Sequence, residues 1–237
     1  IGATNDVLAH AFDDRRPVLV FSLEMSKQQL AQRVLCSRAR VDAHRLRRGA
    51  VQGDDMQRLQ QAAHEASDAP LLVDDASNLS VLELRARARL AHRKHKFRAI
   101  FVDYLQLMRG PRSESRQVEV AEISRGLKAL AKELRVPVIA LAQLNRGPED
   151  RGGNRPRMSD LRESGAIEQD ADVIMLLHRE AYYRAPGDGD IEDNTAEVIV
   201  AKQRNGPTGD VKLHFNKQWT RFDNLHPGGP AGSGFPA

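Results

Sequence analysis

The sequence predicts an α/β fold in which a mainly parallel β-sheet is flanked by helices and followed by an antiparallel hairpin. Before residue 180, short apolar runs alternate with amphipathic stretches, which is the pattern of a parallel sheet covered on both faces. Near residue 195 the pattern changes to an alternation of apolar and polar residues, which is typical of antiparallel strands. With 237 residues, 41% of them hydrophobic, the chain is long enough for one such domain with a full core.

The strands are expected where apolar runs are bounded by polar or turn-forming residues. Buried core strands are expected at 17–22, 99–103, 136–142 and 170–178, and a shorter strand at 71–73. The run at 99–108 is the most informative, because its strand ends in a carboxylate, Asp103. An acid at the carboxyl end of a parallel strand lies where α/β sheets bind ligands.

Helices are expected between these strands. They cover 27–38, 42–48, 54–67, 80–96 and 117–134, and residues 3–14 are expected to be the end of a further helix. Ser26 is suited to cap the first of the five, and Ser80 with Glu83 forms a capping-box signature. In the last helix, Val120, Ile123 and Leu127 keep helical spacing.

The end of the chain has a different character. Residues 196–202 and 211–215 alternate on either side of Asn205-Gly206-Pro207, which predicts a hairpin. The Gly/Pro-rich residues 226–237 predict a disordered tail. No repeat or composition break marks a second domain, so we expect one domain over residues 1–225.

The composition limits which partners and which cellular location the sequence predicts. The formal net charge of +4 permits an anionic partner without specifying one. The single cysteine, Cys36, excludes an internal disulfide, predicts a reducing, cytoplasmic location, and is expected in the core. No apolar run approaches the length of a membrane span, so no membrane partner is expected.

Three polar side chains are expected at one edge of the sheet. Glu24 and Gln143 follow strand ends, as Asp103 does. Hydrolysis of ATP needs a carboxylate that orients or deprotonates water, a carboxylate that supports Mg²⁺, and an amide that senses the γ-phosphate. Each residue alone could be a solvated strand-end group, but the three together favour a nucleotide hydrolase. Asp74 and Asp75 look like a metal pair, although we expect them to end a strand in solvent.

Several longer segments carry a family resemblance. They are "PVLVFSLEM", "FVDYLQLM", "AEISRGLKALAKELRVPVIALAQLNRG", "SDLRESGAIEQDAD" and "AKQRNGPTG". Over roughly residues 15–225 the chain resembles the C-terminal, RecA-like motor domain of DnaB-family replicative DNA helicases. "SDLRESGAIEQDAD" argues against a recombinase-like or circadian-clock-like relative of the same fold.

The resemblance implies roles at the nucleotide. Glu24 would be the catalytic base, Asp103 would serve Mg²⁺, and Gln143 would couple the γ-phosphate to DNA-contacting loops. Arg33, on the helix after Glu24, would face the nucleotide. The implied cofactors are ATP and Mg²⁺.

The resemblance also implies roles at DNA and between subunits. Arg162, Glu163 and Gly165 would hold single-stranded DNA, unless Ser159 and Asp160 merely cap a surface helix. A homo-hexameric ring is implied, as are a primase and a helicase loader as partners.

Lys202 and Arg204 would reach the γ-phosphate of the neighbouring subunit. The alternative for these two is a turn with two exposed cations.

One family element is absent from the sequence. No G-x-x-x-x-G-K-[ST] phosphate-binding loop occurs in the 237 residues. Counting back from Pro17, the family's loop would fall at or just before Ile1, and the first core strand with it. We therefore expect a helicase fragment that lacks the loop and the N-terminal primase-contacting domain and hydrolyses little ATP alone. The alternative is a non-catalytic nucleic-acid-binding or assembly module derived from the same fold.

Overall fold

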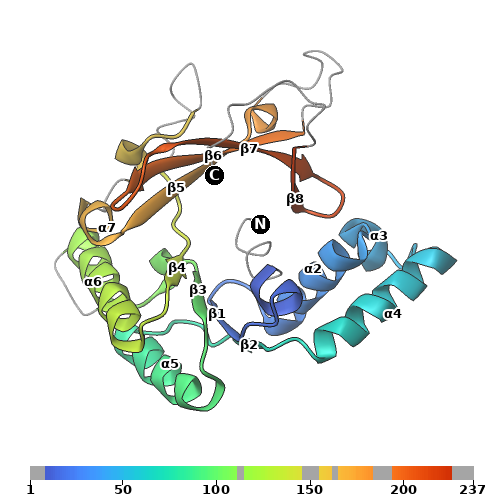
Figure 1. Ribbon diagram of the computed structural model, residues 1–237, viewed down its shortest axis with the longest axis horizontal. Helices are drawn as coiled ribbons and strands as arrows, with labels where there is room; N and C mark the ends of the chain where they lie inside the picture. The colour runs from blue at the N-terminus through green and yellow to red at the C-terminus, as the bar shows by residue number, and fades with distance from the viewer. Residues whose placement is uncertain (1–8, 111–114, 146–154, 162–164, 184–193, 226–237) are drawn as a thin grey trace.

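The computed structural model describes residues 9–110, 115–145, 155–161, 165–183 and 194–225. The described chain contains a parallel and an antiparallel β-sheet of four strands each. Helices lie on both sides of the parallel sheet, and the antiparallel sheet extends above it in Figure 1. The expected parallel sheet flanked by helices is therefore confirmed. None of the described helices is both long and apolar enough to cross a membrane.

The parallel sheet has the strand order β2-β1-β3-β4. Its strands are β1 (Val18–Ser22), β2 (Leu71–Asp74), β3 (Ala99–Asp103) and β4 (Val138–Ala140). Each lies within or close to an apolar run that predicted a strand, and β4 is shorter than expected. Because all neighbouring pairs are parallel, the carboxyl ends of these strands meet at one edge of the sheet.

Five helices lie close to the ranges that the sequence predicts, and two of them begin at the predicted caps. They are α2 (Lys27–Ala39), α3 (Ala43–Arg47), α4 (Gly53–Ser67), α5 (Val81–His95) and α6 (Arg116–Leu134). Ser26 and Ser80 each form a complete capping box with the residue three positions later, which satisfies two backbone N–H groups at each helix start. Of the helix end expected at 3–14, the described part is one π-helical turn, Ala9–Asp13.

The two faces of the parallel sheet are buried by different helices (Figure 1). On one face, Leu19, Phe21 and Ile100 pack with apolar residues of α5 and α6. On the other face, Val20 and Phe101 pack with residues of α2. Successive strand residues point to opposite faces, so an apolar run is needed when both faces are covered. The apolar residues of both faces are therefore covered by helices.

The antiparallel sheet corrects one expectation. Its strands, in spatial order, are β5 (Val173–His178), β6 (Thr195–Gln203), β7 (Gly209–Asn216) and β8 (Arg221–Asn224). The apolar run at 170–178, expected as a fourth core strand, is β5 here; it pairs antiparallel with β6, and its residues alternate between exposed and buried. The hairpin β6–β7 is confirmed, whereas β8 was not predicted.

The stretch before β5 also differs from expectation. Residues 165–170 form a short helix, α7 (Gly165–Asp170), which contacts α6. A short 3₁₀ turn, Leu105–Leu107, follows β3, and a second, Met158–Asp160, precedes α7.

Cys36 is buried in a small cluster between α2 and α4, as expected, and burial raises the pKa of its thiol. The expected tail at 226–237 lies outside the described residues.

Candidate functional site

Glu24, Asp103 and Gln143 follow three neighbouring parallel strands. Ser22, the last residue of β1, is in register with Asp103, the last residue of β3, and β4 is paired on the other side of β3. The backbone N–H of Leu23 donates to the carbonyl of Asp103 at 2.8 Å. All three residues therefore belong to the carboxyl edge of the same sheet, as the sequence predicts.

The turn that carries Glu24 is held by local hydrogen bonds. Ser22 is buried, and its hydroxyl donates to the carbonyl of Met25 at 2.7 Å. Ser26 then caps α2, with its hydroxyl accepting from the N–H of Gln29. Glu24 is exposed between these two fixed points, and Asp103 is half-buried. A carboxylate so placed can meet a water molecule or a metal-bound phosphate without rearrangement of the backbone.

Gln143 is held by a residue that the sequence argument missed, Gln106. The Gln106 side-chain amide donates to the carbonyl of Gln143 at 3.1 Å and accepts from its N–H at 3.2 Å. Arg116, at the start of α6, donates to the carbonyl of Gln106. The backbone of Gln143 is thus fixed while its side chain stays partly exposed. The sequence feature that could have indicated this role is the position of Gln106 in "DYLQLM", shortly after Asp103.

Other acidic and basic candidates have local partners. Asp74, the last residue of β2, pairs with Arg87, and Asp75 after it accepts from the backbone N–H of Lys27. Both are half-buried in these contacts, which corrects the expectation of a solvated strand end. Arg33 lies half-buried on α2. Within the described ranges, no group of three or more His, Cys, Asp or Glu side chains is arranged to hold a metal ion. Mg²⁺ commonly takes only one or two protein carboxylates, so Asp103 alone fits such an ion.

The expected DNA-contacting segment is described only in part. Arg162 and Glu163 lie outside the described residues. Gly165 is exposed at the start of α7, and a Cβ atom there would meet nothing within 4 Å. Just upstream, Asp160 is buried and accepts from the N–H of Arg157 at 2.7 Å. Asp160 thus bonds back to the start of its own 3₁₀ turn, Met158–Asp160, whereas the alternative stated from the sequence was that it caps a surface helix.

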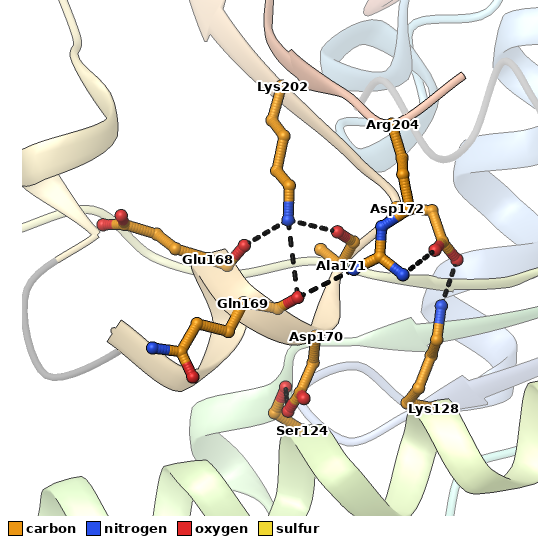
Figure 2. A network of polar contacts seen from close by, with 9 residues as sticks. All are labelled: Ser124, Lys128, Glu168, Gln169, Asp170, Ala171, Asp172, Lys202 and Arg204. Atoms are coloured by element: carbon orange, nitrogen blue, oxygen red, sulfur yellow. Dashed lines mark hydrogen bonds and ion pairs between the residues drawn. The ribbon is translucent and has the colours of Figure 1, made fainter.

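Lys202 and Arg204, near the end of β6, contact the carboxyl end of α7 and the turn that joins it to β5 in the same chain (Figure 2). The Lys202 ammonium donates to the carbonyls of Glu168, Gln169 and Ala171. The Arg204 guanidinium donates to the carbonyl of Gln169 at 3.1 Å and lies 3.4 Å from the carboxylate of Asp172.

The same turn is joined to α6. The Lys128 side chain bonds to Asp172, and this hydrogen bond is the main reason why the pKa of Asp172 is lowered. Asp172 therefore stays ionised between the two cations, Lys128 and Arg204.

Comparison with known proteins decides the family. The model of the DnaB-like helicase C-terminal domain matches residues 3–224.

The chain belongs to this family.

Among curated relatives, the replicative DNA helicase DnaB of Leifsonia xyli subsp. xyli is 48% identical over 214 residues, which cover 89% of this chain and 46% of that protein. The Buchnera aphidicola DnaB is 50% identical over 212 residues, covering 88% of this chain and 46% of that protein. The DnaB-like chain thus spans about half the length of the curated relatives it matches.

Solved structures agree with this assignment. One solved ATPase domain superimposes with a TM-score of 0.86 at 38% identity, covering 95% of this chain and 81% of that chain. The structure of a DnaB-like replicative helicase and its interactions with primase gives a TM-score of 0.85 at 36% identity, with 94% and 56% covered. The fold of this DnaB-like domain is therefore RecA-like, as the sequence resemblance implied.

Proposed function

We propose that the chain is the motor domain of a replicative DNA helicase, which hydrolyses ATP to move along single-stranded DNA and unwind the duplex. One observation carries the proposal. In a RecA-like domain of the DnaB-like family, Glu24, Asp103 and Gln143 follow three adjacent parallel strands at the carboxyl edge. That edge is where open α/β sheets bind ligands.

Glu24 is the general base of the proposed reaction. Its exposed carboxylate takes the proton of the water that attacks the γ-phosphate. The Asp103 carboxylate would hold Mg²⁺, and Arg33 on α2 would contact the nucleotide. When bound, Mg²⁺ supplies positive charge that neutralises the phosphates.

Gln143 reports the state of the γ-phosphate to the DNA-contacting loops. Its backbone is fixed by Gln106, so its side chain changes direction without moving the strand end.

The proposed DNA contact is made by Arg162, Glu163 and Gly165. Arg162 pairs with a phosphate, and Gly165 lets the DNA approach the backbone closely. Such contacts follow the charge and shape of the strand and read no bases.

Each proposed ATP site is completed by a neighbour. Arg204 completes the site of the next subunit in a homo-hexameric ring, where an added cation stabilises transition-state charge. Lys202 is expected from the resemblance to accompany it. We further propose primase and a helicase loader as partners, and the cytoplasm as the location.

The test joins the chain to an upstream segment of the form G-x-x-x-x-G-K-[ST], which supplies the phosphate cradle. The chimera is expected to show Mg²⁺-dependent ATP hydrolysis and strand separation on a forked duplex, and the unextended chain almost none. A chimera that binds ATP and DNA but neither hydrolyses nor unwinds would favour the non-catalytic module. Robust hydrolysis by the unextended chain would contradict the role assigned to the phosphate-binding loop.

A further inference from the structure

The turn between β1 and α2 carries Glu24, the proposed general base. Residues 23–26 form this turn, between the end of β1 at Ser22 and the start of α2 at Lys27. A general base acts only when its oxygen lies within hydrogen-bond reach of the proton that it takes. Because Glu24 is exposed, the place of its carboxylate depends on how the backbone on each side of it is held.

The amino side of the turn is held by β3. The backbone N–H of Leu23 donates to the carbonyl of Asp103 at 2.8 Å, and the Leu23 side chain is buried. The Ser22 hydroxyl donates to the carbonyl of Met25 at 2.7 Å. These contacts fix the backbone up to Glu24, but they do not tie the start of α2 to the sheet.

The carboxyl side of the turn is held by Asp75, from the opposite neighbour of β1. Asp75 follows β2, whose last residue, Asp74, is in register with Phe21 of β1. The Asp75 carboxylate accepts from the backbone N–H of Lys27, the first residue of α2, at 2.9 Å. This hydrogen bond is the main reason why the pKa of Asp75 is lowered.

The start of α2 favours such a partner. The first N–H groups of a helix have no partner within it, and this end of the helix dipole attracts negative charge. Ser26 accepts from the N–H of Gln29, but the first turn, Lys27-Gln28-Gln29-Leu30, contains no carboxylate. Asp75 therefore supplies from a neighbouring strand the negative charge that the helix does not carry itself.

Asp75 is presented from a fixed turn. Both carboxylate oxygens of Asp74 accept from Arg87 of α5, at 3.1 and 3.2 Å, and one of them also accepts from the N–H of Ala76 at 3.1 Å. The residues on both sides of Asp75 are thereby tied to one another. Because the Asp74 oxygens face a guanidinium, the two aspartates do not form the metal pair that their sequence suggests.

We propose that Asp75 is a positioning residue for Glu24. By holding the first N–H of α2, it fixes the carboxyl side of the turn, as the Leu23 bond fixes the amino side, and keeps the Glu24 carboxylate within reach of the attacking water. The proposal rests on the proposed function for the reaction, but not for the hold on α2.

The test breaks the same hydrogen bond from each side. Asp75→Ala removes the acceptor, and Asp75→Asn keeps an acceptor oxygen. Lys27→Pro removes the donor and preserves the helix, because proline suits the first helical position and Ser26 before it is already extended, with φ −65° and ψ 155°. Lys27→Ala, which keeps the N–H, is its matched control.

The first measurement is hydrogen exchange at the Lys27 amide of the chain itself. Asp75→Ala is expected to speed exchange roughly three- to tenfold, because the amide loses its acceptor near solvent. Asp75→Asn is expected to speed it less. Unchanged exchange in Asp75→Ala would overturn the hold on α2.

The second measurement is ATP hydrolysis in the chimera that carries a phosphate-binding loop. Asp75→Ala is expected to lower kcat about ten- to hundredfold, with the KM for ATP and the Mg²⁺ requirement unchanged, because the base is displaced while the binding groups stay. Lys27→Pro is expected to lose a similar factor relative to Lys27→Ala, and Asp75→Asn to recover most of kcat. Added to Glu24→Gln, Asp75→Ala is expected to cause no further loss, since it acts through Glu24.

The outcomes separate the alternatives. An unchanged kcat in Asp75→Ala, or an equal further loss on top of Glu24→Gln, would overturn the positioning role. A raised Mg²⁺ requirement would make Asp75 a metal ligand and would also overturn it. If Asp75→Ala does not fold, Lys27→Pro against Lys27→Ala decides the question. If the parent chimera does not hydrolyse ATP, the proposed function fails, while the exchange data still decide the hold on α2.

Discussion

Gln106 offers the sharpest test of how Gln143, the proposed γ-phosphate sensor, is held. Its side chain makes two hydrogen bonds to the backbone of Gln143, at 3.1 and 3.2 Å, across 37 positions of sequence. Gln106→Met keeps the length of the side chain and removes both its donor and its acceptor. The backbone groups of Gln143 are near solvent, so water can replace part of what is lost.

The expected magnitude follows from the two bonds. A neutral hydrogen bond contributes about 0.5–1.5 kcal/mol net, and partial exposure favours the lower half, so the loss is about 1–2 kcal/mol. For a chain of this length that corresponds to a melting temperature lower by about 2–8 °C. If the loss is local, the N–H of Gln143 exchanges about five- to thirtyfold faster, since it loses its acceptor.

The assay combines hydrogen exchange with turnover. Exchange at Gln143 is measured in the chain itself, and DNA-stimulated ATP hydrolysis in the chimera that carries a phosphate-binding loop. We expect Gln106→Met to lose DNA stimulation while it retains nucleotide binding, because the sensor is loosened and Asp103 is untouched. Gln60→Met, at an exposed position on α4, is the matched control. Unchanged exchange at Gln143 together with full DNA stimulation would refute the reasoning.

Further predictions concern catalysis, DNA, subunits and pH. In the chimera, Glu24→Gln is expected to keep ATP binding and to lose about 10²–10⁴-fold in turnover; unchanged turnover would remove Glu24 from the mechanism. Arg162→Ala is expected to weaken binding equally across DNA sequences and to reduce the salt slope by about 0.7, whereas a loss confined to some sequences would mean base reading. Arg204→Ala subunits and Glu24→Gln subunits, inactive alone, are expected to regain ATP hydrolysis when mixed, and no recovery in verified mixed rings would argue against action in trans. Two arginines of α5 lower the pKa of Glu133 to about 2. Because the folded-state pKa is depressed, the stabilisation is complete above about 4.5, the unperturbed value, and is lost as pH falls towards 2. Glu133→Gln is therefore expected to make the free energy of unfolding depend less on pH between about 4.5 and 2. An unchanged pH dependence would contradict a stabilising contact of Glu133 with Arg85 and Arg89.

Most of the parallel sheet, and the strand-end residues that we propose to bind nucleotide, could be predicted from the sequence. The capping residues Ser26 and Ser80 act on backbone groups within three positions, so the local pattern is sufficient. The strands of the parallel sheet are apolar runs because both of their faces are covered. Once the strands are parallel in one sheet, Glu24, Asp103 and Gln143 share its carboxyl edge, and the strand order β1-β3-β4 makes them neighbours there.

The pairing of β5 depended on the tertiary structure. An apolar run does not say whether its partner is parallel or antiparallel, and β5 joined β6 where a fourth core strand was expected. In this antiparallel sheet one face of β5 is buried and the other is exposed, so exposure alternates along the strand. Strand β8, Arg221–Asn224, contains a single apolar residue, Phe222, so no apolar run marked it in the sequence.

The sequence by itself determined the fold class, the helix starts and the strand-end residues, because each depends on spacing within a few positions. Only the tertiary structure decided that Gln106 holds Gln143 and that Asp75 holds the first N–H of α2. These contacts join residues 37 and 48 positions apart, and their donors and acceptors are a side-chain amide, a carboxylate and backbone groups that leave no periodic pattern. Long-range polar contacts of this kind depend on how the elements pack, which the local spacing of residues does not specify.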